Sequence, residues 1–155
     1  MKSRNVFVSH IQEDESHIKK MYDLLRGAGF ECKDSSITST SPNKATDEDY
    51  IKYKVISPQI EWASTVVVLI TPQTKDSKWV EWEIVRANAL GKRIVGVWTH
   101  GESGCELPAP LVKFADSVVG WNAGSIIKAI NGQESWECSD GSEMDDREIK
   151  RIKCQ

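Results

Sequence analysis

The stretch ASTVVVLIT at residues 63–71 decides how this chain folds. Residues 66–70 within it are apolar without interruption, so the strand that they form has no face suited to water. A strand buried on both faces is typical of the middle of a parallel sheet covered by helices. Shorter apolar stretches predict four more strands, at residues 5–9, 30–32, 93–98 and 117–120.

Helices are expected between these strands. Within residues 14–27, Ile18, Met21 and Leu25 recur at the spacing of one helical face, and glycines follow as stop signals. Two further helices are predicted at residues 78–90 and 125–130. The alternation of strands and helices indicates an α/β fold, a flavodoxin-like doubly wound parallel sheet of about five strands with helices on both faces.

Composition places this fold in a single soluble domain. A chain of 155 residues with 39% hydrophobic content can build one core but not two. The net charge of −3 argues against nonspecific binding to nucleic acid or to an anionic membrane. No apolar run approaches the roughly 20 residues of a membrane span, and residues 1–5 lack the apolar block of a secretory signal. We therefore expect a cytoplasmic protein.

Two segments are not expected to belong to the core. Residues 34–47 are rich in Ser, Thr, Asn and Pro and predict a long loop, after which helical character returns near Asp47 and is disturbed by Pro58. The change in character at residue 132 predicts a domain over residues 1–131 and a flexible or loosely docked tail over residues 132–155.

Cysteine chemistry is not expected to contribute to function. The four cysteines lack metal-ligand spacing, so we expect no metal site, and in the cytoplasm free thiols are the default. These residues are Cys32, Cys105, Cys138 and Cys154.

The candidate chemistry lies where ligands bind open parallel sheets, beyond the carboxyl ends of the strands. Residues 79–84, WVEWEI, follow the third strand. In a helix, Trp79 and Glu83 share one face beside the apolar stripe, which would place the Glu83 carboxylate in a partly desolvated cleft at the edge of the core. The alternative is a plain solvated glutamate, as we expect for Glu81.

These residues match a known family. The chain resembles TIR domains, and in particular the TIR-like proteins of bacterial Thoeris anti-phage systems, over about residues 4–131. The resemblance is carried by a W-x-x-x-E motif on the helix after the third strand, and by the segments around it. These are residues 6–10, 66–71, 79–83, 91–97 and 120–121.

The resemblance implies an enzyme that cleaves the nicotinamide–ribose bond of NAD⁺, which is a substrate here and not a cofactor. It implies that Glu83 engages the nicotinamide ribose, that Phe7, Ser9 and His10 line the nucleotide pocket, and that Trp79 shapes its wall. A purely structural role stays open for three of these: Phe7 as a core residue, Ser9 as the cap of a turn, and His10 as a surface loop residue.

The resemblance also implies a product and partners. It favours a cyclic ADP-ribose isomer as a second messenger in anti-phage immunity, acting on a separate effector protein, although the residues alone do not distinguish it from linear ADP-ribose. Residues 34–47 correspond to the segment that gates the pocket and joins subunits in TIR domains, so other TIR subunits are expected partners.

Three alternatives remain at this point. A nucleoside 2-deoxyribosyltransferase shares the sheet and a glutamate in a setting like residues 83–87, EIVRA. A TIR adaptor that only assembles would not need the carboxylate of Glu83. A response-regulator receiver needs an aspartate at the end of the third strand, where this chain has Thr71 and Pro72, and is therefore disfavoured.

Overall fold

The computed structural model describes residues 5–10, 15–34, 56–70, 78–99 and 109–132. Its strands are β1 (Asn5–Ser9), β2 (Glu31–Asp34), β3 (Thr65–Ile70), β4 (Arg93–Trp98) and β5 (Ser117–Val119). Its helices are α1 (Glu15–Gly27), α4 (Ser57–Trp62), α5 (Lys78–Ala89), α6 (Ala109–Phe114) and α7 (Ala123–Ile130).

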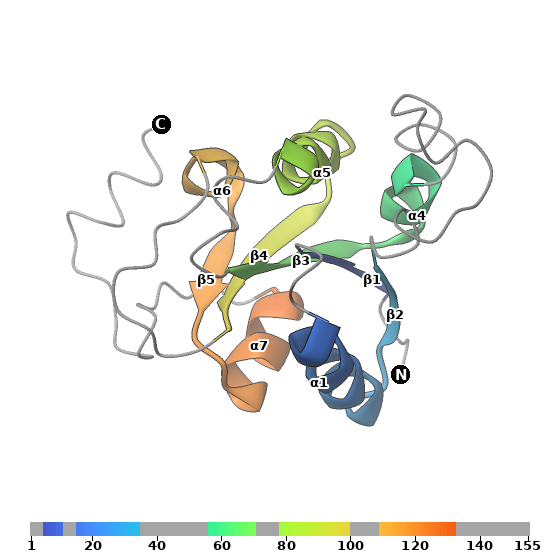
Figure 1. The fold of residues 1–155 in the computed structure, drawn as a ribbon, viewed down its shortest axis with the longest axis vertical. Coiled ribbons are helices and arrows are strands. Elements are labelled where there is room, and N and C mark those ends of the chain that lie inside the picture. The colour runs from blue at the N-terminus through green and yellow to red at the C-terminus, as the bar shows by residue number, and fades with distance from the viewer. Residues whose placement is uncertain (1–4, 11–14, 35–55, 71–77, 100–108, 133–155) are drawn as a thin grey trace.

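The five strands form one parallel sheet in the order β2-β1-β3-β4-β5. Helices α4, α5 and α6 cover one face of the sheet, and α1 and α7 cover the other (Figure 1). This arrangement confirms the predicted doubly wound α/β fold. The direction in which strands are added to the sheet changes between β1 and β3. Strand β2 lies on one side of β1, whereas β3, β4 and β5 lie on the other.

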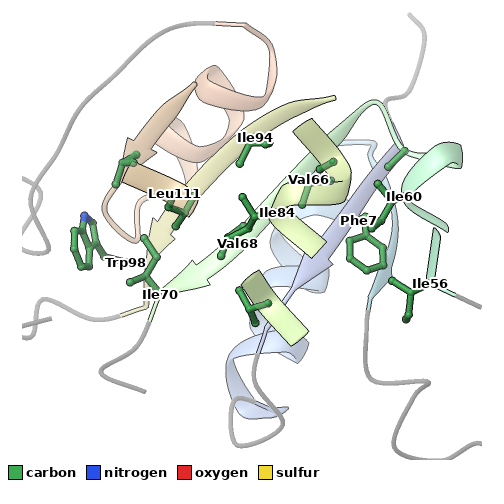
Figure 2. Close-up of a cluster of buried hydrophobic side chains, with 14 residues drawn as sticks. Phe7, Ile56, Ile60, Val66, Val68, Ile70, Ile84, Ile94, Trp98 and Leu111 are labelled. Atoms are coloured by element: carbon green, nitrogen blue, oxygen red, sulfur yellow. The ribbon is translucent and has the colours of Figure 1, made fainter. Parts of the chain in front are cut away.

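Strand β3 is the centre of two cores, as its uninterrupted apolar sequence predicts. All six of its residues are buried. Val66, Val68 and Ile70 point into the cluster beneath α4, α5 and α6, which Figure 2 shows, while Val67 and Leu69 join the cluster beneath α1 and α7. Each helical layer is therefore anchored on the same strand.

Two helices were not predicted. Helix α4 begins at Ser57, with Pro58 in its first turn, where the missing N–H of proline costs no hydrogen bond. The proline that disturbs the helical pattern before it thus opens a new helix. Helix α6 spans six residues, too few to show a helical repeat. The other elements differ from their predicted bounds by no more than two residues at either end.

Some sequence predictions fall outside the described residues. The loop at 35–47, the helical character near Asp47 and the tail from 133 onward are among them, as are three of the four cysteines. Cys32, on β2, is not part of a disulfide bond within the described residues. Within the described residues no cluster of His, Cys, Asp or Glu could hold a metal ion. None of the helices described is long and apolar enough to cross a membrane.

Candidate active site at the carboxyl end of β1

Glu83 is a buried acidic residue on α5. The apolar stripe predicted for this helix is present, since Val80, Ile84 and Ala87 have no exposed surface. Glu83 has an exposed fraction of 0% as well, whereas Glu81 on the same helix is exposed. The sequence predicted that Glu83 would lie at the edge of the core. Instead the structure places it inside the protein, with its Oε2 atom also buried.

The Glu83 carboxylate is hydrogen-bonded to Ser9, the last residue of β1. Ser9 Oγ donates to Glu83 Oε1 over 2.6 Å, between residues 74 positions apart in the sequence. Ser9 has no exposed surface either. A hydroxyl–carboxylate bond of this length lies in the charge-assisted range, where hydrogen bonds are strongest. It joins the carboxyl end of β1 to α5.

The pair lies beside the point where the chain reverses its direction across the sheet. Ser9 pairs with Val68 of β3 in the parallel ladder. Helix α5 packs against β1, β3 and β4. Open α/β sheets bind ligands at the carboxyl ends of the strands flanking such a reversal. The Ser9–Glu83 pair thus occupies the region that the topology favours for a ligand.

Phe7 and His10 are both buried. Phe7 points to the same face of β1 as Ser9 and lies with Ile56 and Ile60 in the core (Figure 2). Its position is that of a core side chain, and a role in a nucleotide pocket stays a prediction. His10 follows β1 and is only 6% exposed, so it is not the surface loop residue that the sequence left open.

Trp79 and two of the segments expected at the site are not covered. The backbone of Trp79 lies in the first turn of α5, one turn before Glu83, but its side chain is outside the described residues. Residues 35–55 and 71–77 lie entirely outside the described residues. Among the residues predicted for the site, the structure therefore brings together Ser9 at the end of β1 and Glu83 on α5.

Other polar contacts join neighbouring elements of the fold. The backbone N–H and the hydroxyl of Thr99 both donate to the carbonyl of Ile70, at 3.1 and 3.0 Å, which ties the carboxyl ends of β3 and β4 together. Arg86 Nε donates to Ser57 Oγ at 3.0 Å, linking α5 to α4. Sequence reasoning predicted neither of these contacts, because each joins elements far apart in the chain.

A buried carboxylate that accepts a short hydrogen bond suits a particular chemistry. Among apolar neighbours, a negative charge stabilises a developing positive charge far better than it does in water. A substrate whose sugar ring becomes cationic as its base departs would meet that requirement.

Comparisons with known proteins agree with the fold. The sequence model of a family described as "Thoeris protein ThsB, TIR-like domain" matches residues 7–104, well over half of the chain. A search of curated proteins found no match.

Solved structures give the same fold. A CMP N-glycosidase of Clostridium botulinum, BcmB, superposes with a TM-score of 0.52 at 16% identity, covering 83% of this chain and 99% of that one. The TIR domain of the Toll-related receptor TRR-2 of Hydra magnipapillata gives 0.53 at 17% identity, covering 83% and 92%. At these identities the likeness shows the fold alone, and that fold is the TIR fold.

Proposed function

The chain belongs to the Thoeris ThsB TIR-like family, and from this membership we propose that it cleaves the bond between nicotinamide and ribose in NAD⁺. The observation that carries the proposal is the buried carboxylate of Glu83, held by Ser9 at the carboxyl end of the sheet. Glu83 is the essential carboxylate in this reaction, and NAD⁺ is its substrate.

The chemistry needs one carboxylate. When the C1′–N bond of the nicotinamide ribose breaks, its electron pair goes to the ring nitrogen, and nicotinamide leaves as a neutral base. The ribose is left as an oxocarbenium-like cation, which the negative charge of Glu83 stabilises. Because the leaving group needs no proton, no separate general acid is required.

The cation is then captured by a nucleophile. Addition of water and loss of its proton gives ADP-ribose. Attack by a nucleophilic atom elsewhere in the same ADP-ribosyl cation, with loss of a proton, gives a cyclic ADP-ribose isomer, and the Thoeris membership favours this outcome. We propose that the cyclic product is made in the cytoplasm and acts on a separate effector protein in anti-phage immunity. We also propose that the enzyme assembles with other TIR subunits.

Access to Glu83 requires movement. Its carboxyl group has no exposed surface, so a ribose can contact it only after the atoms that cover it have shifted. Because binding must supply the free energy of this rearrangement, we expect the isolated chain to bind NAD⁺ weakly, and assays need high NAD⁺ concentrations.

The test is product analysis with the full chain and NAD⁺, followed by chromatography and mass spectrometry. Wild-type protein and Glu81→Gln, an exposed position on the same helix, should release nicotinamide at the same rate. Glu83→Gln should release it about 10²–10³-fold more slowly, the cost of losing one preorganised electrostatic contact. A cyclic product has the mass of ADP-ribose less one water. Release by Glu83→Gln at the wild-type rate contradicts the proposal.

A second candidate is cleavage of a different N-glycosidic bond. One structural neighbour is a CMP N-glycosidase, and the EIVRA setting of Glu83 is similar to that of nucleoside 2-deoxyribosyltransferases. CMP and deoxynucleosides therefore belong in the same assay. Release of their free base without nicotinamide from NAD⁺ would favour this candidate. A chain that only assembles as a TIR adaptor would release neither.

A further inference from the structure

We propose that Ser9 is a positioning residue that orients the Glu83 carboxylate for the reaction and favours its ionised form. This inference rests on the proposed function and adds a role for a second residue. It differs from the role that the resemblance implies for Ser9, which is to line the nucleotide pocket.

The first support is the rigidity of Ser9. Strand β1 pairs with β2 on one side and β3 on the other, so its backbone is held by two ladders. Ser9 is paired with Val68 and has no exposed surface. A hydroxyl on such a strand has a fixed position, and its bond to Glu83 Oε1 restricts the carboxylate to one orientation. Holding a catalytic group in its productive geometry is a recognised contribution to rate.

The second support is the number of hydrogen bonds that the Ser9 hydroxyl can donate. A serine hydroxyl carries one donor proton, and the proton of Ser9 is directed at Glu83. While that bond exists, Ser9 cannot also donate to a ribose or phosphate oxygen. Its effect on the substrate is therefore transmitted through Glu83.

The third support is electrostatic. Val80, Ile84 and Ala87 on α5 are fully buried apolar neighbours along the helix and disfavour a charged carboxylate. A donated hydrogen bond favours the charged form, and its influence is larger where the local dielectric constant is low. The loss of the Ser9 hydroxyl should therefore raise the pKa of the Glu83 carboxyl.

Other described charged groups on the elements around α5 are placed differently. Lys78 and Glu81 on α5, Glu61 on α4 and Lys113 on α6 are exposed. The Nε of Arg86 donates to Ser57, and Arg93 lies at the amino end of β4, opposite to the site. Lys92, after α5, donates to the carbonyl of Glu61. His10, which follows Ser9 at the end of β1, is buried as well.

The test compares Ser9→Ala with Ser9→Thr, which retains the hydroxyl on a residue suited to a strand. Ser117→Ala is the matched control, because Ser117 is also a fully buried strand serine but contacts Arg93 instead. Two quantities are measured in the full chain: the titration midpoint of Glu83 by carboxyl ¹³C NMR, assigned with Glu83→Gln, and kcat for nicotinamide release.

In Ser9→Ala we expect the Glu83 midpoint to move to higher pH and kcat to fall roughly 10- to 100-fold, the rate equivalent of one hydrogen bond to a charged group. KM should change little, and the acid limb of the activity profile should move upward with the midpoint. Ser9→Thr should restore both quantities, and Ser117→Ala should change neither. If Ser9→Ala does not fold, Ser9→Cys, with a weakly donating thiol, should show the same direction of change.

The outcomes separate this inference from the function on which it rests. An unchanged midpoint in Ser9→Ala, or a rise in KM with kcat intact, overturns the positioning role while leaving the function standing. A midpoint shift in a protein that releases no nicotinamide overturns the function, and leaves the Ser9–Glu83 interaction as a structural feature only.

Discussion

Burying a carboxylate such as that of Glu83 works against folding. Removing an ionised group from water costs several kcal/mol unless hydrogen bonds or charges compensate for it. The Ser9 hydroxyl supplies part of that compensation, but an apolar side chain would fit the Val80–Ile84–Ala87 stripe at no such cost. Groups retained against stability are concentrated at functional sites, which makes stability itself a test of the role of Glu83.

We expect Glu83→Gln to leave the free energy of unfolding unchanged or to raise it by up to about 2 kcal/mol, because the amide has nearly the same shape and carries no charge. Its carbonyl oxygen can still accept from Ser9. Urea denaturation of both proteins measures the difference, with Glu81→Gln as an exposed control expected within about 0.5 kcal/mol of wild type. A loss of several kcal/mol would show that Glu83 is retained for stability.

At the scale of elements, predictability follows the length and regularity of the pattern. Strand β3 and helix α5 were predicted because their apolar residues repeat over a full element. Helices α4 and α6 were missed, since six residues are too few to define a period and packing on the sheet stabilises them. The sequence predicted Glu83 and Ser9 as separate site residues, but not the bond between them, because local patterns contain no information on which distant side chains meet.

Packing of α6 on the sheet depends on the glycine in β4. A Cβ atom at Gly96 would lie 3.1 Å from Ile70 Cδ1 and 3.4 Å from both Leu111 Cδ1 and Val118 Cγ2. We therefore expect Gly96→Val to lower the free energy of unfolding by about 1–3 kcal/mol through overpacking, measured by denaturant titration. Gly27→Ala is the control: its Cβ meets nothing within 4 Å, and it should be neutral or slightly stabilising. A stable Gly96→Val would mean that α6 can shift without loss.

Arg93 joins three elements through its planar guanidinium group. Its Nε donates to the carbonyl of Ala129 on α7 at 2.7 Å, and its Nη2 donates to Ser117 Oγ on β5 at 3.2 Å. Lysine keeps the charge but not the fixed geometry of the two donors. Arg93→Lys should therefore cost about 1–2 kcal/mol in thermal or urea unfolding, whereas Lys128→Arg on the exposed side of α7 should cost less than about 0.5 kcal/mol. Equal stability of the two variants would contradict this role for Arg93.

At the scale of the whole molecule, α7 completes the layer that covers one face of the sheet. Ile126, Ala129 and Ile130 are fully buried in the cluster that includes Val67 and Val97. The helix is anchored at its start, where the Asn122 side chain accepts from the backbone N–H of Ser125 at 3.1 Å. The domain predicted over residues 1–131 would therefore end with the helix that closes this core.

Two truncations test that boundary. A chain ending at residue 132 keeps α7, and we expect its free energy of unfolding to lie within about 1 kcal/mol of the full chain. A chain ending at residue 122 loses α7, and with it two buried isoleucines worth roughly 1.5–3 kcal/mol each in a domain whose total stability is of the order of 5–15 kcal/mol. It should unfold without a cooperative transition by circular dichroism. If the first truncation also abolishes cooperative unfolding, residues 133–155 contribute to the core and the predicted boundary is wrong.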